Sequence, residues 1–234
     1  MSLQEIFEIL VPALKETMIM VVVSTLFASI IGMFLAIILI LTDQGGPTPK
    51  KEASSLIKKI YKGLNLLIKV TNKGLDFMIN VFRSFPFVIL MVVVVPLTRA
   101  IAGKSYGTAA AIVPLTIAAA PFVARIIESS LKEVDKGVIE AAKSLGATKT
   151  QIIFKIMLKE ALPSIASGLV LTIISIIGYS AMAGAIGGGG LGNAAINYGY
   201  TRYNAELMWI TVIVIIIVVQ IIQSLGNYIY KKLS

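Results

Sequence analysis

The sequence EAAKSLGATKTQIIFKIML occupies residues 140–158. Its first six residues favour a helix, and Ala141 and Ala142 carry such small side chains that another protein surface can approach the backbone closely. Gly146 can adopt a positive φ angle and end this helix in a tight turn. A second helix is predicted over residues 151–160. The stretch is therefore predicted to be a helix–turn–helix that docks on another protein, with an ordinary helical hairpin as the alternative.

The residues on either side of this stretch are strongly apolar. A transmembrane helix needs about 20 mostly apolar residues, and the chain has five candidates. They are residues 17–41, 77–98, 105–124, 161–183 and 207–230. The second candidate contains Arg83, whose long side chain is expected to reach the membrane interface. Residues 184–201 are also uncharged but rich in Gly and Asn, so they are predicted to form a partly buried loop.

The composition indicates an all-α integral membrane protein. Of the 234 residues, 57% are hydrophobic and only 14% are charged, whereas a soluble domain needs a polar surface. The net charge of +9 is compatible with a nucleic-acid partner. The basic residues cluster beside the apolar spans, however, which fits a lipid bilayer and not a nucleic acid. The chain has no Cys and no His, which excludes disulfides and Cys/His zinc sites within it.

The distribution of basic residues predicts the orientation in the membrane. All but four of the 21 Lys and Arg residues fall in residues 42–83, residues 125–160 or the C-terminal tail. The exceptions are Lys15, Arg99, Lys104 and Arg202. Basic residues near the ends of spans stay in the cytoplasm. The N-terminus is therefore expected outside and the C-terminus in the cytoplasm, which agrees with an odd number of spans.

The chain is divided into three segments from these patterns. They are an outer interfacial helix (1–16), a transmembrane domain (17–230) with a basic cytoplasmic insert (42–76) and a cytoplasmic loop (128–160), and a cytoplasmic tail (231–234). The interfacial helix is expected to place Leu3, Ile6, Phe7 and Leu10 on one face. The insert begins with a turn-rich linker over 44–51 and continues as an amphipathic helix expected on the anionic inner leaflet.

The helix–turn–helix resembles the "EAA" loop of bacterial ABC importer permeases. That pattern consists of Glu-Ala-Ala, three residues, Gly, nine residues, Ile, one residue and Leu-Pro. The matching positions are Glu140, Ala141, Ala142, Gly146, Ile156 and Leu158. The final Pro is replaced by Lys159. The resemblance implies a type I ABC importer permease with five transmembrane helices, in which these six residues form the loop that couples the permease to an ATPase.

Further blocks are similar to those of methionine importer permeases. They are residues 83–87, 111–116, 120–125, 178–182 and 188–192. The resemblance implies a homodimer in a bacterial inner membrane, with ATP-binding cassette ATPase subunits inside and an extracytoplasmic substrate-binding protein outside. ATP would be bound by the ATPase, so this chain would need no cofactor or metal and would not be an enzyme.

The resemblance implies import of methionine by alternating access. One alternative is an ABC importer permease for another amino acid or small solute. A more distant alternative is a secondary transporter or channel. That class needs ionisable groups within its spans for ion coupling, and these spans have almost none.

Tyr179, Ser180 and Met182 in the fourth span are the candidates for the translocation path and its gate. They precede the Gly-rich stretch, and a polarizable Met side chain can close a pore or contact a thioether substrate. The alternative is that these residues pack against lipid or against other helices. Ser180 is not interpreted as a catalytic nucleophile, because the chain has no His to activate it.

Overall fold

The computed structural model describes residues 3–43 and 55–233, and the elements within these ranges are all helical. In chain order they are α1 (Leu3–Asp43), α2 (Ser55–Ser84), α3 (Phe87–Val93), α4 (Val95–Ala102), α5 (Thr108–Lys132), α6 (Lys136–Ser144), α7 (Lys149–Gln151), η1 (Ile152–Met157), α8 (Leu158–Glu160), α9 (Leu162–Ala183), η2 (Gly184–Gly188), α10 (Gly190–Asn193), η3 (Ala194–Tyr200) and α11 (Ala205–Leu233). The η elements are π-helical turns, whose backbone hydrogen bonds join residues five apart. The predicted all-α class is confirmed.

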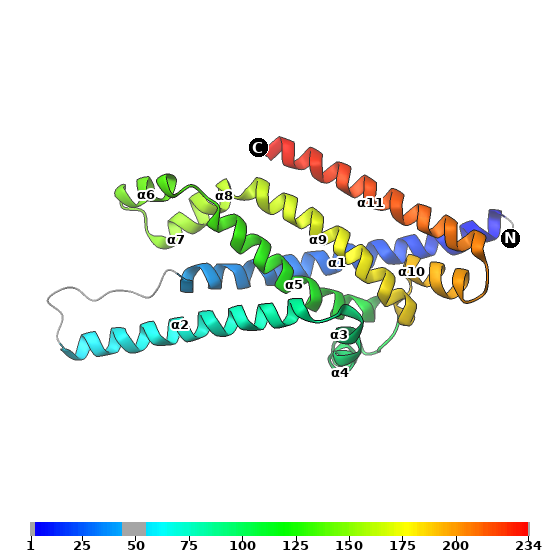
Figure 1. The fold of residues 1–234 in the computed structure, drawn as a ribbon, viewed down its shortest axis with the longest axis horizontal. Helices are drawn as coiled ribbons and strands as arrows, with labels where there is room; N and C mark the ends of the chain where they lie inside the picture. Colours follow the sequence, from blue (N-terminus) through cyan, green and yellow to red (C-terminus); the bar gives the residue numbers. More distant parts are fainter. Residues whose placement is uncertain (1–2, 44–54, 234) are drawn as a thin grey trace.

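The spans run roughly along the long axis of the molecule (Figure 1). Four helices, α1, α5, α9 and α11, are long and apolar enough to cross a membrane, and α2 with α3 forms a bent pair that can be a fifth span. The N-terminus and α10 lie at one end of the molecule, and α6 and α7 lie at the other (Figure 1).

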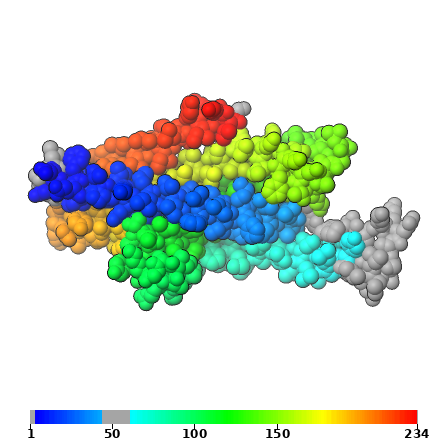
Figure 2. Space-filling model, turned by 180° about the vertical axis from the view of Figure 1, so that it is seen from behind, coloured from blue at the N-terminus to red at the C-terminus, as the bar shows by residue number. Residues whose placement is uncertain are grey.

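Helix α1 is one continuous helix of 41 residues. At 1.5 Å per residue it is about 61 Å long, roughly twice the thickness of the hydrocarbon core. Figure 2 shows it extending along almost the whole length of one face. The expectation of a separate interfacial helix over 1–16 is therefore wrong for the described residues. Ile6 and Leu10 are buried against Leu191 and Leu207, whereas Phe7 is exposed, so only part of the predicted apolar face packs on protein.

The predicted second span is not a single helix. Helix α2 is bent by 109° relative to α3, and the break falls at Pro86. Proline has no backbone N–H and a fixed φ angle, so a helix does not run through it without distortion. It also keeps the preceding residue, Phe85, out of the helical conformation. The chain therefore turns sharply inside the span and continues as two short helices, α3 and α4.

The described part of the basic insert, 42–76, is the end of α1 and the larger part of α2, residues 55–76. Helix α2 lies alongside α1 (Figure 1), and the amide nitrogen of Asn72 donates a hydrogen bond to the carbonyl oxygen of Leu39 at 3.1 Å. The sequence predicts that this helix lies flat on the inner leaflet. It instead follows the direction of the spanning helix α1. The predicted linker over 44–51 lies outside the described residues.

Small residues allow α1 and α5 to approach each other closely. Ala28, Gly32 and Ala36 are four residues apart and are buried on one face of α1. A Cβ atom at Gly32 would lie 2.7 Å from the Cβ atom of Val123. In a bilayer, where lipid tails are as apolar as the side chains, such close packing is a main cause of helix association.

The Gly-rich segment, residues 184–200, is partly helical. Ile186 and Gly187 have non-helical backbone angles and Gly189 has a φ of 83°, so the predicted loop is limited to this turn and the residues after it are helical. Helix α9 ends at Ala183 as predicted, and the chain continues through η2, α10 and η3. A Cβ atom at Gly192 would lie 2.2 Å from the carbonyl oxygen of Ala181. The end of α9 and α10 therefore pack backbone against backbone, with no room for a side chain between them.

Helix α1 holds the start of α10 in place. The N–H of Gly190 donates to Oε2 of Glu16 at 2.6 Å, and the N–H of Leu191 donates to Oγ1 of Thr17 at 2.8 Å. The first N–H groups of a helix have no partner within it, and here two side chains of α1 supply those partners.

Candidate functional site

The connector between α5 and α9, residues 133–161, contains the predicted helix–turn–helix. Helix α5 continues to Lys132, so the connector begins slightly later than the predicted boundary at residue 128. Asp135 precedes α6, and its Oδ1 accepts hydrogen bonds from the N–H groups of Gly137 at 2.7 Å and Val138 at 3.3 Å. An Asp at this position satisfies helix N–H groups that would otherwise be unpaired.

The turn after α6 is a Schellman motif. Gly146 has a φ angle of 80°. Its N–H donates to the carbonyl of Lys143 at 3.0 Å, and the N–H of Ala147 donates to the carbonyl of Ala142 at 3.1 Å. These two bonds define the motif, which favours Gly at the left-handed position. The prediction that Gly146 ends the first helix is confirmed, and its spacing from Ala142 follows from the geometry of the turn.

The second helix of the connector begins with a capping box. The N–H of Thr148 donates to Oε1 of Gln151 at 2.8 Å, and the N–H of Gln151 donates to Oγ1 of Thr148 at 3.3 Å. This reciprocal pair is a strong signal for the start of a helix. The helix runs through α7, η1 and α8, so the predicted second helix is confirmed and begins two residues earlier than expected.

The six residues of the sequence motif divide into two groups. Three are exposed, namely Glu140, Ala141 and Gly146. The other three pack against the core, namely Ala142, Ile156 and Leu158. The first group is available to another protein, and the second fixes the connector to the rest of the chain.

The connector also exposes large apolar side chains that the motif does not contain. Leu145 is 88% exposed, and Val138 and Phe154 are also exposed. Exposed apolar side chains that cluster among polar ones mark surfaces for binding another protein. The sequence contained a signal for Leu145, because a Leu directly before the turn residue Gly146 has no neighbouring span to cover it.

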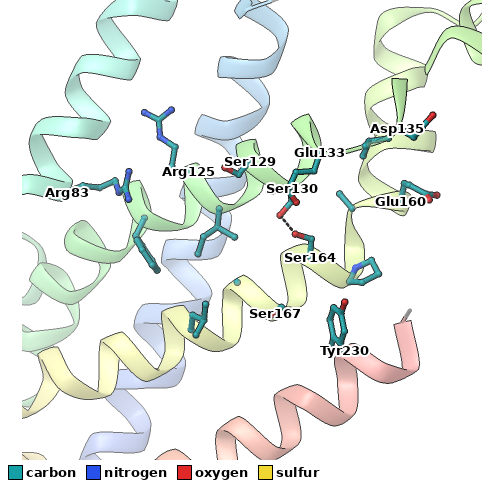
Figure 3. A pocket seen from close by; sticks show the side chains of 17 residues that line it. Arg83, Arg125, Ser129, Ser130, Glu133, Asp135, Glu160, Ser164, Ser167 and Tyr230 are labelled. Carbon is teal, nitrogen blue, oxygen red and sulfur yellow. Dashed lines mark hydrogen bonds between the residues drawn. The ribbon is translucent and has the colours of Figure 1, made fainter. Parts of the chain in front are cut away.

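The buried side of the connector is continuous with the core between the spans. Ala142 belongs to the same buried cluster as Leu131 of α5 and Ile165 of α9. The hydroxyl oxygens of Ser130 and Ser164 lie 2.8 Å apart and join α5 to α9 near the connector (Figure 3). Because protein interiors are closely packed and transmit strain, a displacement of the connector moves both helices.

The three candidate gate residues do not share one environment. The ring of Tyr179 stacks on Phe87 of α3, with 4.9 Å between ring centroids and 13° between ring planes. Ser180 is buried, and its hydroxyl donates to the carbonyl of Ile177 in its own helix at 2.8 Å. Met182 is 46% exposed. Residues three apart on a helix share a face, so Tyr179 and Met182 lie together and Ser180 points elsewhere.

Two cavities adjoin these helices. The larger has a volume of about 970 Å³ and extends from Arg83 and Phe122 to Asp135 and Glu160 of the connector (Figure 3). The smaller has a volume of about 530 Å³ and contains Tyr179 in its wall. Both cavities include Arg83 and Phe122, so they meet there. In the described part of the chain, no cluster of three His, Cys, Asp or Glu side chains is suited to a metal ion.

Comparison with known proteins identifies the family. Residues 60–234 match the family described as "Binding-protein-dependent transport system inner membrane component". The chain belongs to this family. Within it, the "Probable D-methionine transport system permease protein MetI" of Vibrio cholerae serotype O1 is 44% identical over 227 residues, which are 97% of this chain and 93% of the relative. The "Methionine import system permease protein MetP" of Bacillus subtilis is 46% identical over 161 residues, 69% of this chain and 72% of the relative.

Solved structures of ABC transporters share the fold. A chain from the inward-facing MetNI methionine ABC transporter is 38% identical, superposes with a TM-score of 0.85, and matches over 100% of both chains. A chain of an amino acid ABC transporter with histidines superposes with a TM-score of 0.74 at 20% identity, over 98% of this chain and 94% of the other. The fold expected for a type I ABC importer permease is confirmed, and the chain is the non-catalytic membrane component of such an importer.

Proposed function

We propose that this chain is the permease of an ATP-driven methionine importer and carries methionine into the cell by alternating access. The observation that supports the substrate most directly is the 44% identity to a methionine permease over 97% of the chain. Import of another amino acid by the same mechanism is the alternative.

The assembly that follows from family membership contains further subunits. Two copies of the chain form the membrane path, ATPase subunits bind inside, and a substrate-binding protein delivers methionine from outside. ATP is bound and hydrolysed by the ATPase, and this chain supplies no cofactor site. The connector is the part of the chain that docks on the ATPase, with Glu140, Ala141 and Gly146 on its exposed side.

The coupling mechanism rests on the two sides of the connector. The ATPase binds its exposed side, and its buried side packs into the core shared by α5 and α9. Closure of the ATPase dimer on ATP would therefore tilt α5 and α9. Met182 would close the translocation path on its outer side, and Tyr179 would line the path.

The substrate assignment is tested by uptake. Membrane vesicles that contain the chain, its ATPase and its binding protein are expected to accumulate labelled methionine only when ATP is supplied. Unlabelled methionine should compete, and other amino acids should compete less. Uptake of a different amino acid without uptake of methionine would contradict the assignment and support the alternative.

The orientation is part of the proposal, with the N-terminus outside and the C-terminus in the cytoplasm. Because the chain has no Cys, single cysteines report position without background. A cysteine at Lys104 is expected to react with a membrane-impermeant thiol reagent added to intact cells. One at Lys149 is expected to react only after the membrane is opened. The reverse pattern of labelling would overturn this orientation.

A further inference from the structure

Arg83 lies beside an aromatic ring of α5. Its guanidinium carbon lies 5.8 Å from the centroid of the Phe122 ring. Phe122 is two residues before the end of the apolar stretch 105–124, so Arg83 lies toward the inner end of the spans. Its side chain is exposed and lines both cavities, so its charge is available to a ligand that enters them.

Arg125, one turn after Phe122 on α5, provides a contrast to Arg83. Arg125 donates to Asp76 at 2.6 Å, to Glu128 at 2.7 Å and to Asn80 at 2.9 Å. Its charge is therefore balanced within the chain. Arg83 forms no ion pair or hydrogen bond with any residue that the structure describes, and its guanidinium faces the ring of Phe122. Figure 3 shows both arginines at the end of the larger cavity remote from Asp135 and Glu160.

The smaller cavity presents aromatic rings beside this free guanidinium. Its wall includes Phe87 of α3, Phe122 of α5 and Tyr179 of α9, together with Phe85 in the bend between α2 and α3, and its volume is about 530 Å³. Binding sites for small molecules have volumes of roughly 300–1,000 Å³. This cavity lies in that range, and its exposed wall is more polar than apolar. The polar groups here are Arg83 and the side chains of Asn80 and Ser84.

We propose that this cavity is a binding site for the amino acid in transit, with Arg83 as the anchor for its carboxylate. A planar guanidinium pairs with a carboxylate through two parallel hydrogen bonds. An apolar or thioether side chain fits among the aromatic rings, since sulfur makes favourable contacts with ring edges. The inference rests on the proposed function in that it takes methionine as the substrate.

The connection between the two cavities gives the site a direction of release. Both include Arg83 and Phe122, so a ligand that leaves the smaller cavity enters the larger one beside the same side chains. The larger cavity extends to the connector. The site therefore lies between Met182 and the connector, at the start of the exit toward the ATPase side.

The test uses the complete transporter, with its ATPase and binding protein, in lipid nanodiscs and in vesicles. Arg83→Gln removes the charge, Arg83→Lys keeps it without the planar pair, and Arg99→Gln is the matched control at an exposed position away from both cavities. We expect Arg83→Gln to lower methionine uptake at least ten-fold and Arg83→Lys to give an intermediate rate. Arg99→Gln should leave uptake unchanged, and the ATPase rate stimulated by loaded binding protein should stay within two-fold of native in all three variants.

A direct binding measurement separates a substrate contact from a structural role. Labelled methionine is equilibrated with the permease–ATPase complex without binding protein, and binding to the ATPase alone is subtracted. The native complex is expected to bind methionine and to release it to unlabelled methionine but not to methioninol, which lacks the carboxylate. Arg83→Gln is expected to weaken this binding at least ten-fold.

The failures are distinguishable. If the native complex imports no methionine, the proposed function fails. If it imports methionine and Arg83→Gln imports it equally well, the site is wrong and the function stands. If Arg83→Gln does not assemble, Ala118→Phe provides the second variant, because Ala118 lines the smaller cavity and a ring there fills it with Arg83 intact. Assembly of Ala118→Phe with native uptake would overturn the site, and assembly with at least ten-fold lower uptake supports it.

Discussion

The connector and the Gly-rich segment both join spanning helices, but they are built in opposite ways. The connector exposes a large apolar side chain, Leu145, on a turn that its own chain does not cover. The Gly-rich segment leaves so little space that a Cβ atom at Gly184 would lie 2.5 Å from the backbone nitrogen of Asn193. One is shaped to be held by another protein, and the other is held by its own chain.

This difference indicates how the two ends of the molecule take part in transport. A surface that binds a moving partner needs uncovered apolar side chains, because their burial on docking supplies the free energy of association. A segment that resists deformation needs close backbone contact with no spare volume, because packed interiors have low compressibility. Under the proposed function, we expect force to enter at the connector and the Gly-rich segment at the far end of α9 to move as a rigid piece.

The largest effect on the protein is expected from adding a side chain within the closely packed Gly-rich segment. Gly192→Ala places a methyl group 2.2 Å from the carbonyl oxygen of Ala181, and a backbone atom cannot move aside without displacing its helix. Unfolding free energy should fall by about 3 kcal/mol or more, measured as a lower midpoint of thermal unfolding of the purified permease. Gly178→Ala is the control, because no atom lies within 4 Å of that Cβ. Equal midpoints for the two variants would contradict the rigid packing.

The next largest effect is expected at the exposed end. Leu145→Asp should lower methionine uptake at least ten-fold, since a charge in place of a docking side chain costs about 2–4 kcal/mol at the centre of an interface. The amount of permease in the membrane should not change, because Leu145 is exposed in the isolated chain. Leu145→Met should transport almost normally, as apolar swaps of similar volume are well tolerated. Native uptake by Leu145→Asp would remove this residue from the docking surface.

The smallest effect is expected where α9 meets the Gly-rich segment. If two copies of Met182 close the path, they form an apolar constriction that excludes water and solutes. Met182→Ala should then cause a slow leak of methionine without ATP, and Met182→Leu should be nearly normal. The measurement is efflux from loaded vesicles in the absence of ATP. A lower amount of tightly coupled transporter, with no leak, would show that Met182 only packs against a neighbour.

The parts of the fold that depend on local chemistry were predictable from the sequence. The end of the first connector helix at Gly146 follows from the need for a positive φ angle, and the end of α9 near Ala183 follows from the Gly run after it. The apolar spans were recognisable because a bilayer demands length and hydrophobicity alone.

The features that depend on distant partners were not predictable. The first turns of α1 are amphipathic, and the sequence cannot distinguish lipid from Leu191 as the cover of that face. Proline in a span either bends a helix slightly or breaks it, depending on the neighbours that satisfy the freed carbonyls, so the 109° bend at Pro86 was missed. The contact of Arg83 with Phe122 was also not predictable, because the two residues are 39 positions apart and only the folded chain brings them together.

The contact between α1 and α10 has a consequence for the synthesis of the protein. Glu16 is made early, and its partner Gly190 lies 174 residues later in the chain. At about 5–20 residues per second, the ribosome takes on the order of 10 to 35 seconds to produce that partner. Throughout this interval the carboxylate of Glu16 has no N–H of α10 to accept from. The end of the molecule that holds α10 therefore cannot close before most of the chain has been synthesised.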